Sequence, residues 1–224
     1  MGKIFKQTLV FIILSLVFIS FIPILKYSTR PIGLGDSDRY YKIALSLPTF
    51  SGEAPWGYRI LVPYLVTILP FELKDNFMIV SYISFLLINL IIYYWFRGMG
   101  FSVLQSFCTC LLYIFSFVGI YNFHNFVHIG LFEQLLFLIA FISIQKNKFL
   151  PLFLVVLFGS FAKETFILLI PLYFIVNFDK TAKKSIIFKT STLLVVYFLI
   201  FFLIRETNLF FSNNARFSFY TKLA

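Results

Sequence analysis

The residues best suited to chemistry in this sequence stand in a short polar stretch, residues 33–41. Two carboxylates, Asp36 and Asp38, are separated by one residue, and Arg39 and Tyr40 follow them directly. A carboxylate pair at this spacing can bind a divalent cation or place a general base beside a hydroxyl group, and the flanking glycines let the backbone approach a ligand closely. Asp36 and Asp38 are therefore the candidate catalytic residues and, if a divalent cation is the cofactor, its candidate ligands.

The same stretch also has a structural interpretation. A short helix is expected over residues 39–47, and either Asp36 or Asp38 would cap its amino terminus. The Asp-x-Asp pattern is short and common, so the sequence leaves both interpretations open.

A second polar position, Arg59, begins an apolar segment over residues 58–71. A guanidinium group there can hold a phosphate with two hydrogen bonds while its stem stays in the membrane interface. The alternative is an interfacial anchor formed by Trp56, Tyr58 and Arg59, a composition that is usual at that depth.

Two histidines, His124 and His128, are four residues apart, so one face of a helix could present both imidazoles. The spacing suits a metal ion, but the His-Glu-x-x-His pattern is missing. We therefore expect a polar helix end that faces a substrate. Glu133 follows within an apolar run, and a carboxylate in that position usually faces a cavity or a partner.

The last polar cluster is the adjacent pair Lys163 and Glu164, which stands between two short apolar runs. The two charges can neutralise each other at a turn. However, even paired charges cost several kcal/mol in hydrocarbon relative to apolar residues. A role in binding a substrate is the competing interpretation.

The elements that must position these residues are membrane helices. Of the 224 residues, 60% are hydrophobic and 12% are charged, whereas a globular domain has about 45–50% and about 25%. A soluble enzyme, a nucleic-acid-binding domain and a disordered tail are excluded, so the net charge of +10 is assigned to orientation and anionic headgroups. The two cysteines, Cys108 and Cys110, lie in an apolar run and predict neither a disulfide framework nor a zinc site.

Seven apolar runs can cross a membrane, and charge decides how they are oriented. The runs are 4–25, 77–96, 101–121, 127–144, 149–161, 166–178 and 186–204. The shorter segment 58–71 carries Pro63 and Pro70 and could span, re-enter or lie on the surface. If it does not cross, nine of the 19 basic residues are cytoplasmic, and if it crosses only seven are. Cytoplasmic loops collect Lys and Arg, which favours the arrangement without a crossing.

The prediction is an all-α integral membrane protein, a single polytopic domain over residues 1–224. It has about seven transmembrane helices (six to eight), a cytoplasmic amino terminus and a retained first span. A short amphipathic or re-entrant segment is expected in the first extracytoplasmic loop. In this topology the polar clusters all fall on the extracytoplasmic face.

Taken together, these clusters resemble the motifs of the polytopic GT-C glycosyltransferases. The stretch 35–41 is similar to their acidic motif after the first span, residues 58–63 match a Tyr-Arg-x-Leu-x-Pro segment of many bacterial members, and residues 162–165 match a later Lys-Glu motif. The resemblance covers roughly residues 1–205 and implies a seven-helix core module. It also implies sugar transfer from a polyprenyl-phosphate donor to a glycan, lipid or protein, at the outer face of a bacterial inner or plasma membrane.

The resemblance also implies residue roles. Asp36 or Asp38 would deprotonate the acceptor or help to hold a metal ion, and Arg59 and Lys163 would bind the donor phosphate. The remaining candidates for contact with the substrate are Arg39, Tyr40, His124, His128 and Glu164. Members of the family usually carry further helices or a soluble carboxy-terminal domain, so we expect a short or truncated member, or one that needs a partner subunit.

Two other classes of function remain. A non-catalytic membrane subunit of a cell-envelope complex would tolerate loss of Asp36 and Asp38. A lipid or solute transporter would use Glu133 and Lys163 in a permeation path, and inverted repeats would favour it. No such repeats are visible in the sequence.

Overall fold

The computed structural model describes residues 36–46, 56–125 and 127–211, without the side chains of 123, 124 and 207–211. Every element in this described part is a helix. In chain order the elements are α2 (Asp36–Ser46), η1 (Trp56–Tyr58), α3 (Leu61–Ile68), α4 (Leu73–Gly98), α5 (Val103–Ile114), α6 (Phe117–His124), α7 (Gly130–Gln145), α8 (Phe149–Ala162), η2 (Glu164–Leu168), α9 (Leu169–Asn177) and α10 (Lys183–Phe211). The predicted all-α fold is confirmed. The first expected span, residues 4–25, lies outside the described residues.

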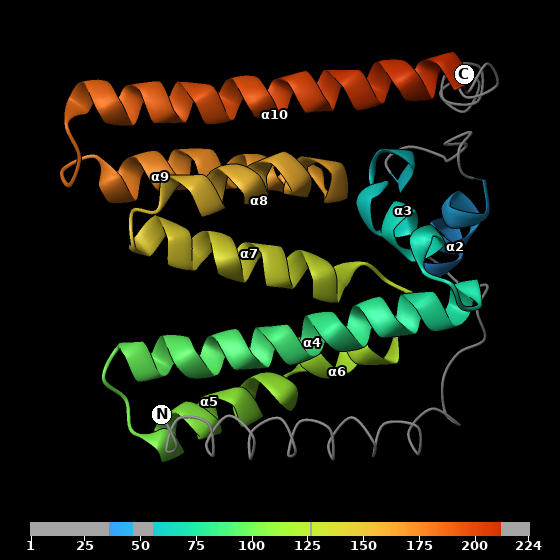
Figure 1. Ribbon diagram of the computed structural model, residues 1–224, viewed down its shortest axis with the longest axis horizontal. Coiled ribbons are helices and arrows are strands. Elements are labelled where there is room, and N and C mark those ends of the chain that lie inside the picture. Colours follow the sequence, from blue (N-terminus) through green and yellow to red (C-terminus); the bar gives the residue numbers. More distant parts are fainter. Residues whose placement is uncertain (1–35, 47–55, 126, 212–224) are drawn as a thin grey trace, which may run out of the picture.

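The long helices run side by side in alternating directions, and α2 and α3 lie across one end of the bundle (Figure 1). Helix α4 packs against α5 and α7, α7 packs against α8, and α10 packs against α8 and α9. We call the end that carries α2 and α3 the loop end. The connections α4–α5, α7–α8 and α9–α10 lie at the opposite end (Figure 1).

The segment 58–71, left ambiguous by the sequence, begins at the last residue of η1 and contains α3. Helix α3 has 8 residues, a length of roughly 12 Å, which is far less than the hydrocarbon thickness of about 30 Å. Buried Asn76, in the first turns of α4, holds this segment at the loop end. Its Nδ2 donates to the carbonyls of Val66 (2.8 Å), Leu69 (2.9 Å) and Phe71 (3.1 Å).

Within the described part of the chain, two helices have the length and composition of a membrane span. They are α4 and residues 183–206 of α10. The shorter apolar helices are α5, α7, α8 and the pair η2–α9. Large apolar side chains also face outward, among them Phe117 (79% exposed) and Leu112 (74% exposed). Such a surface is rare on soluble monomers and, with the two long apolar helices, is consistent with membrane association.

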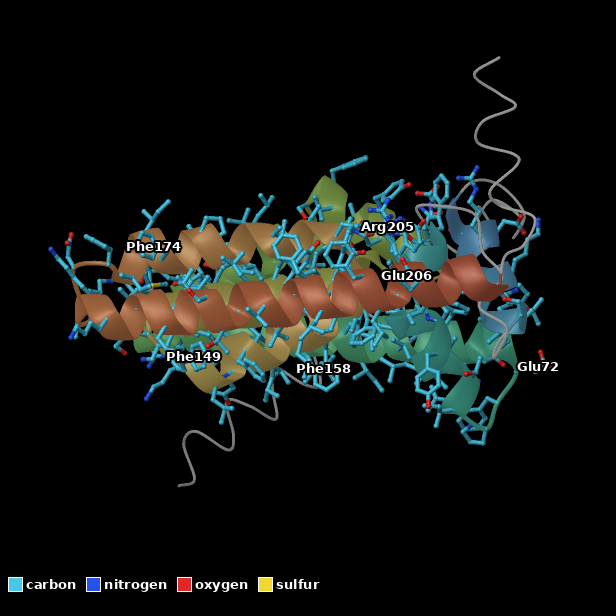
Figure 2. All side chains as sticks on the ribbon, turned by 90° about the horizontal axis from the view of Figure 1, so that it is seen from above. Glu72, Phe149, Phe158, Phe174, Arg205 and Glu206 are labelled. Atoms are coloured by element: carbon cyan, nitrogen blue, oxygen red, sulfur yellow. The ribbon has the colours of Figure 1, made fainter. Side chains whose placement is uncertain are left out.

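The view from above shows how polar and apolar side chains are divided along the bundle. In Figure 2, Phe149, Phe158 and Phe174 lie along its flanks, whereas Glu72, Arg205 and Glu206 lie toward the loop end. Acidic side chains of the described part follow the same division. Asp179 lies at the opposite end. The other acidic residues of the described part belong to segments at the loop end: Asp36, Asp38, Glu72, Asp75, Glu133, Glu164 and Glu206.

Candidate functional site

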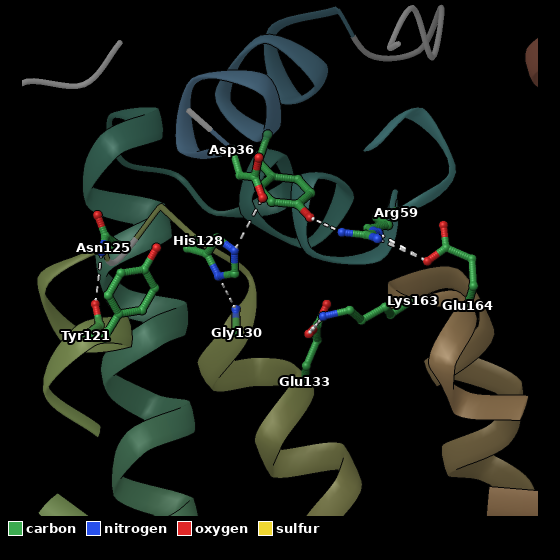
Figure 3. A network of polar contacts seen from close by, with 10 residues as sticks. Asp36, Arg59, Tyr121, Asn125, His128, Gly130, Glu133, Lys163 and Glu164 are labelled. Carbon is green, nitrogen blue, oxygen red and sulfur yellow. Dashed lines mark hydrogen bonds and ion pairs between the residues drawn. The ribbon is translucent and has the colours of Figure 1, made fainter. Parts of the chain in front are cut away.

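Polar side chains from distant parts of the chain meet at the loop end (Figure 3). They come from α2, from the residue after η1, from the α6–α7 connection, from α7 and from the break between α8 and η2. The participating residues are Asp36, Tyr40, Arg59, His128, Glu133, Lys163 and Glu164. We call this group the loop-end cluster.

Arg59 joins three of these segments. Its Nε donates to Glu164 Oε2 (3.2 Å) and one Nη donates to the Tyr40 hydroxyl (3.0 Å), while the other Nη lies 3.2 Å from Glu164 Oε2. Burial lowers the pKa of the guanidinium, but the contacts with Tyr40 and Glu164 outweigh it and leave that pKa above its usual value. Burial also raises the pKa of Tyr40 to about 12. Tyr40 is therefore a neutral phenol that accepts from Arg59 near pH 7.

Lys163 forms the second ion pair of the cluster, with a partner distant in sequence. Its Nζ lies 2.8 Å from Oε2 of Glu133, whose side chain is only 6% exposed. The adjacent Glu164 pairs with Arg59 instead. The backbone explains this division, because Lys163 has an extended conformation (φ −166°, ψ 146°), in which successive side chains point to opposite sides. Of the two interpretations that the sequence left open, mutual neutralisation of Lys163 and Glu164 does not describe this structure, because each of them pairs with a residue from another segment.

The break between α8 and η2 is fixed from both sides. The Lys163 N–H donates to the carbonyl of Gly159 (2.8 Å), and the Tyr197 hydroxyl donates to the carbonyl of Glu164 (2.8 Å). Gly159 leaves room for the ring of Phe166, because a Cβ at position 159 would lie 2.2 Å from that ring. Phe166 in turn stacks on Phe137 of α7, with ring centroids 4.3 Å apart.

The two carboxylates of the cluster also carry unused hydrogen-bonding capacity. Oε1 of Glu133 and Oε1 of Glu164 are buried and have no hydrogen-bond partner among the described residues. A buried acceptor of this kind is costly unless something donates to it. A ligand that carries O–H or N–H groups could supply the missing donors.

His128 lies opposite these pairs. The backbone N–H of Gly130 donates to its Nδ1 (3.1 Å), and its Nε2 lies 4.0 Å from Asp36 Oδ2. The ring meets Tyr40 and Tyr121 edge-on, with centroid distances of 5.8 and 6.4 Å. Burial lowers the pKa of His128; Asp36 opposes this shift, and Lys163 and Arg59 reinforce it.

The two candidate catalytic carboxylates, Asp36 and Asp38, point in different directions and have different partners. Both lie in the first turn of α2, and residues two apart on a helix point in directions about 200° apart. Asp36 faces His128, whereas Asp38 forms an ion pair of 2.6 Å with Lys42, a side chain that is 70% exposed. Helix α2 thus begins earlier than the expected residue 39. Across residues 36–46, 56–125 and 127–211, no three His, Cys, Asp or Glu side chains are grouped as a metal site requires.

The structure does not place the two histidines on one helix. Helix α6 ends at His124, and α7 begins at Gly130, so His128 belongs to the connection between them. At this connection the Asn125 N–H donates to the Tyr121 carbonyl, and the His128 N–H donates to the Asn125 carbonyl (2.7 Å). The possibility of a common helical face does not hold, because α6 ends at His124. The side chain of His124 lies outside the described part.

Two arginines lie beside the cluster without joining it. The Arg39 guanidinium stacks on the Trp56 ring, 3.5 Å from its centroid. Arg205 of α10 lies 5.3 Å from the centroid of Tyr58 and 4.8 Å from that of Phe201. Among the described residues neither arginine has a carboxylate partner.

The sequence did not single out every residue that builds the site. Arg205, which lies beside the cluster, was not singled out, since it stands at the end of an apolar run. Glu133 was recognised as unusual, but its pairing with Lys163 was not predicted. Gly130 gave no signal, because a glycine that supplies a backbone donor looks like any other in sequence.

Comparisons with known proteins supply no family for this chain. No protein-family model matches it, and neither a curated protein nor a solved structure does.

Proposed function

We propose that this chain is a membrane glycosyltransferase. It would transfer a sugar from a polyprenyl-phosphate donor to a hydroxyl group of a glycan, lipid or protein at the extracytoplasmic face. One observation carries the proposal: Asp36, a candidate general base, lies in the same loop-end cluster as Arg59 and Lys163, two candidate phosphate ligands. A base and two cations are what attack by a hydroxyl on a phosphate-activated sugar needs.

The charge distribution supports the proposed orientation. Opposite the loop end stand mostly basic side chains: Arg97, Lys146, Lys148, Lys180, Lys183, Lys184 and Lys189. Cytoplasmic segments collect Lys and Arg, so this end would be cytoplasmic and the cluster extracytoplasmic. The passes α4, α5–α6, α7, α8, η2–α9 and α10, together with residues 4–25, would then make about seven spans with a cytoplasmic amino terminus. The expected location is a bacterial inner or plasma membrane.

The proposed reaction assigns one task to each group. Asp36 accepts the proton of the acceptor hydroxyl while that oxygen forms a bond to the anomeric carbon. The bond between this carbon and the phosphate oxygen breaks, and its electron pair leaves on the polyprenyl phosphate. Arg59 and Lys163 stabilise the growing negative charge, because each has N–H donors beyond those that its carboxylate partner uses.

The matched variants Asp36→Asn and Asp38→Asn test the proposal. Membranes that contain the wild-type chain or either variant are supplied with radiolabelled polyprenyl-phosphate glucose and polyprenyl-phosphate mannose, and transfer to envelope acceptors is measured. We expect Asp36→Asn to lose about 10²- to 10⁴-fold of the transfer rate, because general-base assistance has that magnitude. Asp38→Asn should stay within a few-fold of wild type, since Asp38 pairs with exposed Lys42.

The same assay also distinguishes a transferase from the two other classes of function. A non-catalytic subunit would tolerate both substitutions, and a transporter would move the donor across vesicles without transferring sugar. Equal activity of wild type and Asp36→Asn would exclude Asp36 as the general base.

A further inference from the structure

The Gly130 backbone fixes the position of the ring proton of His128. Because the Gly130 N–H donates to Nδ1 at 3.1 Å, the lone pair of Nδ1 is occupied, and the proton of the neutral ring lies on Nε2. Burial lowers the pKa of this imidazole, which favours the neutral form near pH 7. His128 therefore presents Nε2–H toward Asp36.

The close contact requires glycine at position 130. A Cβ there would lie 2.9 Å from His128 Nδ1 and 2.1 Å from Asn122 Oδ1. Asn122 is itself held in place, because its Nδ2 donates to the Val118 carbonyl (2.9 Å). The geometry that orients the imidazole is thus built into the start of α7.

The distance between His128 Nε2 and Asp36 Oδ2 is one that a single bridging oxygen atom would span. At 4.0 Å, Nε2 and Oδ2 are too far apart for a direct hydrogen bond, which needs about 2.7–3.2 Å. An oxygen placed about 2.8 Å from each atom satisfies both. It must accept from Nε2–H and donate to the carboxylate, and an alcohol hydroxyl does both.

The groups around this position favour a neutral occupant. The rings of Tyr40 and Tyr121 lie against His128, and Lys163 and Arg59 act on it only through space. The nearest facing charge is the Asp36 carboxylate, which would repel an anion. A hydroxyl group of the acceptor fits this position better than the donor phosphate does.

We propose that His128 and Asp36 together hold the acceptor hydroxyl. His128 Nε2–H donates to the hydroxyl oxygen, and Asp36 accepts its proton when the oxygen attacks. His128 is then a donor and not the base, because its Nε2 already carries a proton. The identity of the hydroxyl as that of the sugar acceptor rests on the proposed function, whereas the imidazole tautomer and the binding of a hydroxyl do not.

The first test is ¹⁵N NMR of the full chain with labelled histidine, in phosphatidylcholine nanodiscs. The chain has 2 histidines, so the His124→Gln variant assigns both sets of signals. We expect His128 to be neutral and protonated on Nε2 at pH 7.5, and its pKa to fall further in Asp36→Asn but not in Asp38→Asn. A proton on Nδ1, or an unchanged His128 titration in Asp36→Asn, would overturn the proposal.

The second test uses a panel of methyl hexosides as hydroxyl probes and their fully O-methylated derivatives as controls. At least one methyl hexoside should shift the His128 Nε2 signal, its O-methylated form should not, and Asp36→Ala, which removes the acceptor for the hydroxyl proton, should abolish the shift. No shift with any member of the panel would refute hydroxyl binding. Both NMR tests are independent of turnover, so an inactive chain that passes them would refute the proposed function alone.

The third test compares substitutions of His128 in the transfer assay. His128→Gln keeps an N–H donor near the Nε2 position, whereas His128→Ala removes it. We expect His128→Ala to lose at least 10-fold more activity than His128→Gln, which corresponds to the loss of one hydrogen bond to the substrate. Equal losses in both variants would assign His128 a structural role only.

Discussion

Lys163 Nζ lies 2.8 Å from Glu133 Oε2, and this ion pair ties the break between α8 and η2 to the first turn of α7. Glu133 is 6% exposed and Lys163 is 28% exposed, so the carboxylate depends more on its partner than the ammonium does. Lys163 is therefore needed to keep a buried charge compensated, besides its proposed contact with a phosphate.

Removing one partner of this ion pair should lower the free energy of unfolding more than removing both partners does. Lys163→Met leaves the Glu133 carboxylate buried without its cation, and we expect a loss of about 3–5 kcal/mol in the free energy of unfolding. The double variant Glu133→Gln/Lys163→Met should recover most of that loss. Thermal unfolding of Glu133→Gln, Lys163→Met and the double variant in detergent measures the coupling. Additive effects would show that the ion pair contributes nothing to stability.

The packing of Gly159 against Phe166 predicts a steric effect. Gly159→Ala places a methyl group where its carbon would be 2.2 Å from the Phe166 ring. The Phe166 ring must move, which disturbs its stacking on Phe137, and we expect a loss of about 1–3 kcal/mol, as for overpacked cores. Gly98→Ala is the matched control, because nothing lies within 4 Å of a Cβ at position 98. The same unfolding temperature for wild type and Gly159→Ala would contradict the packing argument.

The sequence predicted the helices better than their ends. Hydropathy places the run 149–161 close to α8 (Phe149–Ala162) and the run 186–204 inside α10, because continuous apolar character is a local property. The run 101–121 is instead divided into α5 and α6. Ser116 begins the second helix by accepting from the Gly119 N–H (3.0 Å), and a single serine within an apolar run barely changes its hydropathy.

The partners within the candidate site depend on tertiary structure, and the sequence could not supply them. It singled out Asp36, Arg59 and Lys163 because charges are rare in this chain. It did not distinguish Asp36 from Asp38, since that choice depends on the helical phase of α2 relative to His128. Hydrogen bonds that join distant segments leave no periodic signal.

Asn76 provides a prediction about the docking of α3. Its Nδ2 donates to the carbonyls of Val66, Leu69 and Phe71. Asn76→Asp replaces the donor with an acceptor at nearly the same size and leaves these carbonyls unpaired, so we expect a loss of about 2–4 kcal/mol in stability. Asn89→Asp is the control, because Asn89 Nδ2 donates only within its own helix, to Phe85. Protease cleavage within residues 56–71 should accelerate in Asn76→Asp, and unchanged cleavage would argue against this anchor.

His128 predicts how stability depends on pH. Its pKa is lowered from 6.5 by burial, and Lys163 and Arg59 add to this while Asp36 opposes it. The folded protein therefore binds a proton less readily than the unfolded chain does. The contribution of the neutral imidazole to stability is fully present above pH 6.5 and is lost as the pH falls from there through the lower pKa of the folded state. Unfolding temperatures of wild type should fall between pH 7.5 and pH 5, and His128→Gln should flatten this dependence while His124→Gln should not. An equal slope in wild type and His128→Gln would assign the pH dependence to other groups.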